Sequence, residues 1–401
     1  MSLPADDAKI ASVALAGAAP RRGLRQEYAT NTLQNATKMT TSNAERSSPA
    51  RTTSIPIAEL QRFIASVLTA VGMPAADATT VGAIMAQADA RGADAHGVFR
   101  LPAYVKRIRA GGINLRPDMR IVEERAATAL LDGDNAMGHL VMKRATDLAI
   151  DKARRAGIGW VGTRHSNHAG PAGLYARMPL EHGMIGIYMA VGSANHMPPW
   201  GGIDMLLSTN PIAIAVPAAK RPPIVLDMAT TTAAYGKVKA LAQRGQTMPE
   251  GWMVGRDGKP LLDPKRSDEG FLLPIGGAKG YGLALMFGVL AGTLNGAAFG
   301  RDVVDFNKDY QSVTNTGQAV AAIDVTAFMP LAQFEACIDD IWAQMKSSEL
   351  LPGAQEIRLP GEQSAITYED RVTHGVPLHA ELITALGTLA RDVGVDPLGG
   401  G

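Results

Sequence analysis

The middle of the chain alternates short apolar runs with amphipathic stretches, and this pattern restricts the possible folds more than any other feature. The apolar runs with the length of buried strands lie at 129–134, 158–163, 184–191, 212–216 and 224–228. The stretches with helical spacing lie at 57–71, 76–90, 137–156, 173–182, 232–241, 281–294, 331–346 and 378–390. The sequence therefore predicts a mixed α/β fold, with a sheet-rich centre between helical ends.

Charge and cysteine content exclude several classes of protein. The 401 residues include 39 Lys and Arg against 38 Asp and Glu, so the strongly basic surface of a nucleic-acid binder is not expected. Cys337 is the one cysteine, which excludes an intrachain disulfide framework and a multi-cysteine zinc site. The purely apolar part of 280–299 is shorter than the roughly 18–20 residues of a membrane helix. We expect a cytoplasmic enzyme that binds neither nucleic acid nor membrane.

Residues 1–52 differ from the rest of the chain, because Ser, Thr, Asn and Ala dominate them without hydrophobic periodicity. The apolar run at 10–19 could belong to a targeting segment. However, Asp6 and Asp7 precede it with a single lysine, unlike the basic start of a signal peptide. We predict a disordered extension over 1–52, with translation from Met39 as the other interpretation.

His96, Arg100 and Tyr104 follow one another at intervals of four residues, which would place them on one face of a helix. Arginine can hold a carboxylate through two parallel hydrogen bonds, and histidine can exchange the proton of a neighbouring hydroxyl. The set is suited to a 2-hydroxy or 2-oxo acid. Pro102 favours a helix that begins near it, which would leave His96 in the preceding loop. Alternatively, His96 caps a helix and Arg100 pairs with a surface acid.

Polar residues also gather in glycine-rich segments further along the chain. His165 and His168 follow a predicted strand, but no cysteine or carboxylate lies beside them, so we predict no metal site. Lys279 stands between glycines, where it could approach a phosphate or serve as an ordinary surface residue. Asp227 could accept a hydrogen bond from a ribose hydroxyl or cap the next segment. No G-x-G-x-x-G links a strand to a helix and no P-loop occurs, so neither of these nucleotide-binding folds is supported.

Taken together, these segments resemble the malate/L-lactate dehydrogenase family, which includes ureidoglycolate, L-sulfolactate and diketogulonate oxidoreductases and cyclic imino-acid reductases. The resemblance runs from about Ser54 to Val393 and keeps the family's order of motifs. The eight segments that carry it are Asp94-Ala-His-Gly-Val-Phe-Arg-Leu-Pro, Ser166-Asn-His-Ala-Gly, Pro198-Pro-Trp-Gly-Gly, Thr209-Asn-Pro, Leu226-Asp-Met-Ala-Thr, Pro249-Glu-Gly-Trp, Lys279-Gly-Tyr-Gly and Leu359-Pro-Gly-Glu.

The resemblance implies a fold unrelated to the Rossmann fold. It implies a cofactor domain with a largely antiparallel sheet over 126–329 and a helical substrate and dimerisation domain built from 53–125 with 330–393. It also implies a homodimer with its sites near the subunit interface. Without the resemblance, the alternating pattern would favour a doubly wound parallel sheet.

The resemblance also implies roles for individual residues. His96 matches the acid/base histidine and His168 a second active-site histidine, while Arg100 matches the carboxylate-binding arginine and Tyr104 a substrate-side tyrosine. The residues that match cofactor-binding segments are Ser193, Ile224, Val225, Leu226, Asp227, Met228, Ala229, Thr230, Lys279, Gly280, Gly361, Glu362 and Gln363. One position departs from the family, since Ala95 stands where a serine usually precedes the catalytic histidine.

The predicted function is an NAD- or NADP-dependent oxidoreductase that interconverts a small 2-hydroxy acid of the malate, lactate or ureidoglycolate type and its 2-oxo acid. The alternative within the family is a cyclic imino-acid reductase, which would reduce C=N instead of C=O. A metal-assisted lyase or hydrolase that uses His165 and His168 is a remote alternative, and a non-catalytic binding module is a third.

Overall fold

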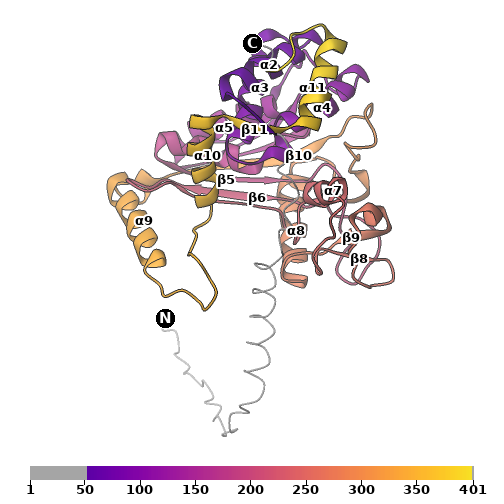
Figure 1. Ribbon diagram of the computed structural model, residues 1–401. Helices are drawn as coiled ribbons and strands as arrows, with labels where there is room; N and C mark the ends of the chain where they lie inside the picture. Colours follow the sequence, from indigo (N-terminus) through magenta and orange to yellow (C-terminus); the bar gives the residue numbers. More distant parts are fainter. Residues whose placement is uncertain (1–51, 400–401) are drawn as a thin grey trace, which may run out of the picture. The chain divides into compact units, whose positions relative to one another are not determined.

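The structure is a computed structural model that describes residues 52–399 (Figure 1). The extension expected over 1–52 lies outside the described residues, except for Thr52, which begins the first strand. The strands are β1 Thr52–Ile55, β2 Arg120–Glu124, β3 Thr128–Asp132, β4 Ile158–Ser166, β5 Met184–Ala190, β6 Ile212–Val216, β7 Ile224–Met228, β8 Met253–Gly255, β9 Gly270–Leu272, β10 Thr316–Asp324 and β11 Val376–His379. The α-helices are α2 Ile57–Ala70, α3 Ala75–Ala90, α4 Leu101–Arg109, α5 Gly138–Ala156, α6 Ala172–Arg177, α7 Tyr235–Gln243, α8 Ala278–Ala291, α9 Leu331–Lys346, α10 Glu362–His374 and α11 Ala380–Val393.

The main sheet has seven strands in the order β2-β3-β4-β10-β5-β6-β7. Only the β3–β4 pair in this sheet is parallel, and every other neighbouring pair is antiparallel. The largely antiparallel sheet expected from the family resemblance is therefore confirmed. A doubly wound parallel sheet is excluded.

The strand β10 lies at the centre of the sheet and pairs with β4 on one side and β5 on the other. All of its residues from Thr316 to Ala322 are buried. Helix α5 packs against β4 and β10, and Gly159 permits the close approach, because a Cβ atom there would overlap the carbonyl of Ala149. Small residues therefore set the distance between the sheet and its covering helix.

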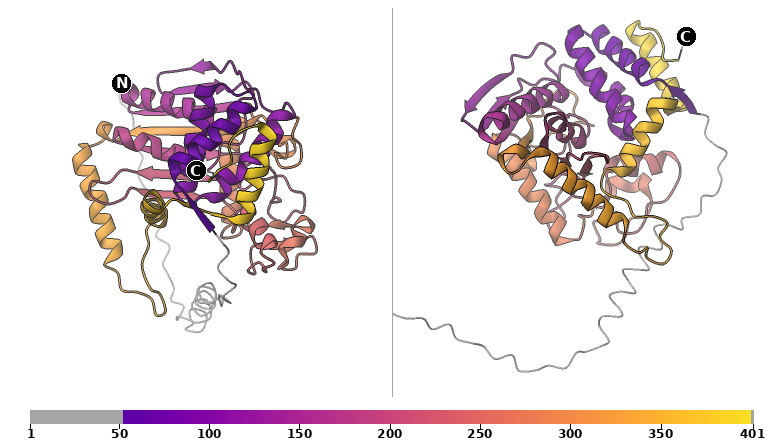
Figure 2. Two further views of the ribbon diagram at one scale, coloured as in Figure 1. Left: turned by 45° about the horizontal axis from the view of Figure 1, so that its top comes forward. Right: turned by 90° about the vertical axis from the view of Figure 1, so that its left-hand side faces the viewer.

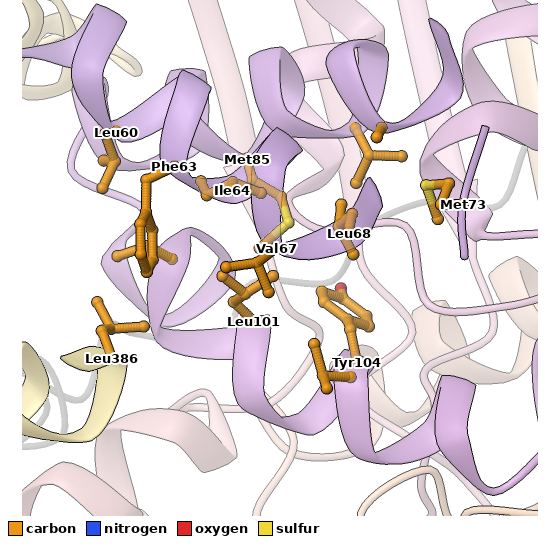
Figure 3. Packing of buried hydrophobic residues seen from close by; sticks show 14 of the residues in the cluster. Leu60, Phe63, Ile64, Val67, Leu68, Met73, Met85, Leu101, Tyr104 and Leu386 are labelled. Carbon is orange, nitrogen blue, oxygen red and sulfur yellow. The ribbon is translucent and has the colours of Figure 1, made fainter. Parts of the chain in front are cut away.

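A second core joins the two ends of the described chain. Helices α2, α3, α4 and α11 gather in the upper part of Figure 1. Figure 3 shows their packed side chains, including those of Phe63, Leu101 and Leu386. Each fully buried side chain of this size contributes about 1.5–3 kcal/mol of burial free energy. The antiparallel pair β1–β11 ties the same two ends together through backbone hydrogen bonds.

The helical packing from both ends agrees with the predicted fold class, while the predicted domain boundaries remain predictions. The boundary at 125/126 falls between β2 and β3, which pair in the main sheet. Helix α9, assigned to the helical domain, packs Ile338 and Trp342 against Val216 and Ile224 of β6 and β7. Figure 2 shows α9 in orange apart from the purple N-terminal helices.

No helix within residues 52–399 combines the length and the apolar character that a membrane crossing needs. Helix α8 is the most apolar of them, and it exposes part of that surface. Leu283 and Met286 on α8 are 41% and 52% exposed, and Leu294 just after it is 63% exposed.

Candidate active site

His96 lies in a short turn that precedes α4, and this settles how the predicted trio is arranged. The 3-10 turns Asp94–His96 and Val98–Arg100 come first, and α4 begins at Leu101 with Pro102 in its first turn. The prediction of one helical face for His96, Arg100 and Tyr104 is therefore wrong. The alternative based on Pro102, with His96 in the preceding loop, is correct, because proline is best accepted in a first turn.

Asp89, at the end of α3, shapes the turn that carries His96. Its side-chain Oδ2 accepts a hydrogen bond from the Val98 N–H at 2.8 Å. A Cβ atom on Gly97 would overlap the Asp89 carboxylate, so glycine is required beside the carboxylate. Burial raises the pKa of Asp89 to about 8, although the hydrogen bond from Val98 lowers it.

The two predicted histidines, His96 and His168, lie together, although they are 72 positions apart in the sequence. The rings of His96 and His168 are stacked, with centroids 5.4 Å apart and an angle of 13° between the ring planes. The hydroxyl of the fully buried Tyr104 lies 2.6 Å from His168 Nδ1. The Gly170 N–H also points to His168 Nδ1, at 3.4 Å. A main-chain N–H can only donate, so Nδ1 is an acceptor, and neutral His168 carries its proton on Nε2.

Both imidazoles of the pair are neutral near pH 7. Burial lowers the pKa of His96 to about 4, and the positive charge of Arg100 lowers it further. Burial also holds the pKa of His168 well below its usual value, with the charges of His96 and Arg100 acting in the same direction. Burial raises the pKa of Tyr104, which therefore keeps its proton. A neutral imidazole can accept a proton from a substrate hydroxyl.

Arg100 brings a positive charge to the same place without a carboxylate to neutralise it. Its Nε donates to the Ala95 carbonyl at 3.0 Å, and its Nη1 donates to Asn307 Oδ1 at 3.1 Å. No carboxylate among the described residues forms an ion pair with it. The alternative in which Arg100 pairs with a surface acid is therefore wrong. The uncompensated guanidinium beside two neutral histidines is suited to an anionic ligand.

Several residues that support the site were missed by reading the sequence. The fully buried Arg107 donates from Nε to Asn167 Oδ1 at 3.1 Å and from Nη1 to the Asp309 carbonyl at 2.5 Å. Asn167, directly before His168, donates to the Ala136 carbonyl at 2.9 Å. These bonds fix the segment before His168 to α4 and to the loop that carries Asn307. In the sequence, Arg107 stands among the basic residues Lys106 and Arg109, so nothing singles it out as buried.

His139, at the start of α5, is a further buried histidine behind this group. It is fully buried, and its ring meets that of Tyr104 edge to face, with centroids 5.4 Å apart. Neither of its ring nitrogens has a hydrogen-bond partner within the described part of the chain. Burial lowers the pKa of His139 to about 3, and the charge of His96 acts in the same direction. It is therefore a neutral packing partner of Tyr104.

A pocket of about 510 Å³ is bordered by segments that adjoin the two histidines in the sequence. Its wall includes Ala93, three residues before His96, and Pro171, three residues after His168. Four of the predicted cofactor-binding residues line it, namely Val225, Asp227, Gly361 and Gln363. Asp227 lines the pocket, and its carboxylate accepts a hydrogen bond from the Gly173 N–H at 2.8 Å. Burial raises the pKa of Asp227, although this hydrogen bond and the charge of Arg177 lower it.

Other predicted cofactor residues lie along β7 and beyond it, outside the pocket wall. Ile224, Leu226, Met228 and Ala229 are half-buried in β7 or directly after it. The carbonyl of Thr230 accepts from the Ile275 N–H at 3.0 Å, which joins the end of β7 to the loop before Lys279 and Gly280.

The remaining four predicted cofactor residues differ in their surroundings. Lys279 is exposed at the start of α8, and Gly280 beside it is buried. The Ser193 carbonyl accepts from the Phe306 N–H at 2.9 Å. Glu362 accepts from Lys346 Nζ at 2.6 Å and from the Leu359 N–H at 2.9 Å, so it holds the loop that lines the pocket.

The two histidines considered for a metal site have separate partners. His165 Nδ1 lies 2.9 Å from Asp132 Oδ2, whereas His168 Nδ1 faces Tyr104. Over residues 52–399, no group of three or more His, Cys, Asp and Glu side chains has an arrangement that could hold a metal ion.

Comparison with known proteins places this arrangement in a family. The family model described as malate/L-lactate dehydrogenase matches residues 55–387. The chain belongs to the malate/L-lactate dehydrogenase family. It is 40% identical over 352 residues to a malate dehydrogenase of Pyrococcus abyssi, which covers 86% of this chain and 96% of that protein. The resemblance and the oxidoreductase class predicted from the sequence are therefore confirmed.

Solved structures and a second branch of the family support the same conclusion. The structure of malate dehydrogenase from Pyrococcus horikoshii OT3 matches with a TM-score of 0.80 and 37% identity, and covers 88% of this chain and 99% of that chain. A Delta(1)-pyrroline-2-carboxylate/Delta(1)-piperideine-2-carboxylate reductase of Pseudomonas putida is 35% identical over 246 residues, which is 61% of this chain and 72% of that protein. Members of the family thus carry the names of two different reactions.

Proposed function

We propose that this oxidoreductase interconverts a small 2-hydroxy acid and its 2-oxo acid with a nicotinamide cofactor. The observation that carries the proposal is the pair of stacked, neutral imidazoles of His96 and His168 beside the uncompensated charge of Arg100. A 2-hydroxy acid places a carboxylate and a hydroxyl on neighbouring carbons. The site offers a cation for the first and a base for the second.

Each group has one defined task in the proposed reaction. Arg100 binds the substrate carboxylate, and this neutralises the charge that lowers the pKa of His96. His96 Nδ1 is enclosed without a partner among the described residues, which leaves Nε2 to take the hydroxyl proton. His168, with Nδ1 bound to Tyr104, donates from Nε2 to the same substrate oxygen. A bound nicotinamide ring would supply the acceptor for the hydride of the hydroxyl-bearing carbon.

The variant His96→Ala tests the assignment. A positioned general base contributes about 10²–10⁴-fold to the rate, so turnover should fall by that factor. Binding of reduced cofactor, followed by fluorescence titration, should stay nearly unchanged. Near-normal turnover in His96→Ala would give the proton transfer to His168. Absence of cofactor oxidation with every 2-oxo acid and cyclic imine tested would refute the proposal as a whole.

The surroundings of Arg100 favour a substrate with a second acidic group, such as malate. A Cβ atom on Gly236 would lie 3.4 Å from Ala95 Cβ, so α7 begins beside the His96 turn. Lys239, one turn further, lies 5.2 Å from the Tyr235 ring centroid. Burial lowers the pKa of Lys239, and the positive charge of Arg100 lowers it further, while Asp305 raises it. We expect higher kcat/KM for malate than for lactate, and a selective loss for malate in Lys239→Met.

The second candidate is reduction of a cyclic imino acid, which the Pseudomonas putida relative supports. The same arginine could bind its carboxylate, and the same histidines could protonate the ring nitrogen. A parallel assay with piperideine-2-carboxylate and with oxaloacetate separates the two reactions. Greater kcat/KM for the cyclic imine would favour the second candidate.

Two further parts of the proposal concern the state of the protein. We propose a homodimer, which the exposed side chains of Leu283, Met286 and Leu294 support as a surface for a second copy. Met286→Glu should shift the species found by light scattering from dimer to monomer. A cytoplasmic location also remains a proposal, supported by the single, exposed Cys337.

A further inference from the structure

The pocket that Ala93 and Pro171 border has mostly basic residues among its charged side chains. Its wall includes four basic side chains, namely Arg91, Arg177, Lys237 and Arg358, against one acidic side chain, Asp227. The bases come from different elements, at the ends of α3 and α6, in α7 and in the loop before α10. They therefore surround the pocket instead of forming one surface stripe.

Arg177 is the basic residue whose charge is least satisfied. Within residues 52–399 its guanidinium has neither a hydrogen bond nor an ion pair, and the residue is half-buried. Burial lowers the pKa of Arg177 to about 10, Arg91 lowers it further, and Asp227 raises it. An arginine in such surroundings is stabilised strongly by an anionic ligand, because water reaches it poorly.

The other basic residues are better satisfied but still face the pocket. Arg91 stacks on the Tyr368 ring, with its guanidinium carbon 4.1 Å from the ring centroid. Arg358 donates to Gln363 Oε1 and forms an ion pair with Glu356 at the exposed rim. Lys237 is exposed on α7. Arg177 and Arg91 are therefore the inner cations, and Arg358 and Lys237 are the outer ones.

Asp227 offsets only one of these positive charges. One of its carboxylate oxygens is already bound to the Gly173 N–H, and the nearby Arg177 charge interacts with it. Glu356, outside the wall, pairs with Arg358, so the four basic side chains stand against two carboxylates and a formal excess of two positive charges remains. The 2′-phosphate of NADP carries about 1.5 to 2 negative charges, which is comparable with this excess. An arginine near the ribose is a common means of accepting that phosphate.

We propose that this pocket binds the 2′-phosphoadenosine end of NADP, that Arg177 is the main contact of its 2′-phosphate, and that the enzyme prefers NADP to NAD. The inference rests on the proposed function, since it names the cofactor of the same site. It assigns a selectivity role to Arg177, with Arg358 at the rim as a second contact.

Binding of cofactor fragments tests the inference without any turnover. Isothermal titration with adenosine 2′,5′-bisphosphate and with 5′-AMP compares two ligands that differ by the 2′-phosphate. We expect the bisphosphate to bind the wild-type protein at least about tenfold more tightly. Equal or weaker binding of the bisphosphate would overturn the proposal, whatever the substrate of the enzyme is.

Variants then locate the contact. Arg177→Gln should weaken bisphosphate binding by roughly tenfold to a hundredfold, as expected for the loss of a charge-assisted hydrogen bond, with little change for 5′-AMP. Arg358→Gln should do the same to a smaller extent, and it gives a second test if Arg177→Gln folds poorly. Arg116→Gln is the matched control, because Arg116 is exposed and outside the pocket wall. Equal losses for both ligands in Arg177→Gln and Arg358→Gln would refute the assignment.

Failure of the NADP assignment and failure of the proposed reaction would give different results. A protein that binds the bisphosphate selectively but oxidises no reduced cofactor would retain the pocket assignment and lose the reaction. A protein that reduces 2-oxo acids with lower KM for NADH than for NADPH would retain the reaction and lose the selectivity.

Discussion

Replacement of Asp89 by asparagine should change how the stability of the protein depends on pH. Asp89 is 1% exposed, accepts the Val98 N–H at 2.8 Å, and lies against Gly97 in the turn that carries His96. Burial raises its pKa from 3.8 to about 8. The carboxyl group is therefore mostly protonated in the folded protein at pH 7, whereas it is ionised in the unfolded chain.

The sign of the effect follows from proton binding. Between pH 4 and pH 8 the folded state holds a proton on Asp89 that the unfolded chain has lost. The free energy of unfolding therefore falls as pH rises through this window. The slope is at most about 1.4 kcal/mol per pH unit, so the contribution lost by pH 8 has a ceiling of about 6 kcal/mol. It is retained below pH 4, where both states are protonated.

Asparagine keeps the shape of the side chain and its carbonyl acceptor, but it does not titrate. We expect Asp89→Asn and the wild type to have similar free energies of unfolding at pH 5, with the variant gaining on the wild type as pH rises to 8. Urea titrations at intervals across this range measure the difference. Parallel pH dependence of the two proteins would show that Asp89 ionises normally. Asp89→Ala is the contrast, because loss of the acceptor for Val98 should cost about 1–3 kcal/mol relative to Asp89→Asn at every pH.

Three further outcomes follow from the same geometry. Because the pKa of His96 is about 4, kcat/KM for hydroxy-acid oxidation should stay level down to about pH 5. An inflection of the pH profile near pH 6.5 would contradict a neutral, buried base. Tyr104→Phe removes the hydroxyl that lies 2.6 Å from His168 Nδ1. We expect kcat to fall by about tenfold while cofactor affinity stays the same. An unchanged kcat in steady-state kinetics would exclude a positioning role for Tyr104. Gly97→Ala forces a Cβ atom into the Asp89 carboxylate and should lower the free energy of unfolding by about 1–3 kcal/mol, as measured by thermal melts. Gly282→Ala serves as the control, because nothing lies within 4 Å of its Cβ position.

Much of the fold was accessible from hydrophobic patterns, and one central strand was not. The predicted strands at 184–191, 212–216 and 224–228 correspond to β5, β6 and β7. The strand β10, at the centre of the sheet, was not predicted, because its sequence is rich in alanine and contains glycine, which do not favour strands locally. Its conformation is set by two long-range partners, β4 and β5, which no local pattern reveals.

The candidate site shows the same division between local and long-range information. His96, His168 and Arg100 were singled out because their residue types suit an acid/base reaction on a carboxylate. Asp89 and Arg107 were not, because a charged residue on a helix is usually a surface residue. Only the packing of α3 and α4 into the shared core makes them buried, and burial gives them their role.

The pocket wall and the two stacked histidines share two short segments of the chain. Ala93 and Pro171 line the pocket, and each lies three residues from one of the stacked histidines, His96 or His168. Hydrogen bonds fix both segments: Asp89 accepts from the Val98 N–H in the first, and Asn167 donates to the Ala136 carbonyl in the second. Asp89 and Asn167 therefore anchor the two loops that carry the proposed acid/base pair. Because a shift of about 1 Å in such a pair can cost about a hundredfold in rate, the anchors matter as much as the histidines themselves.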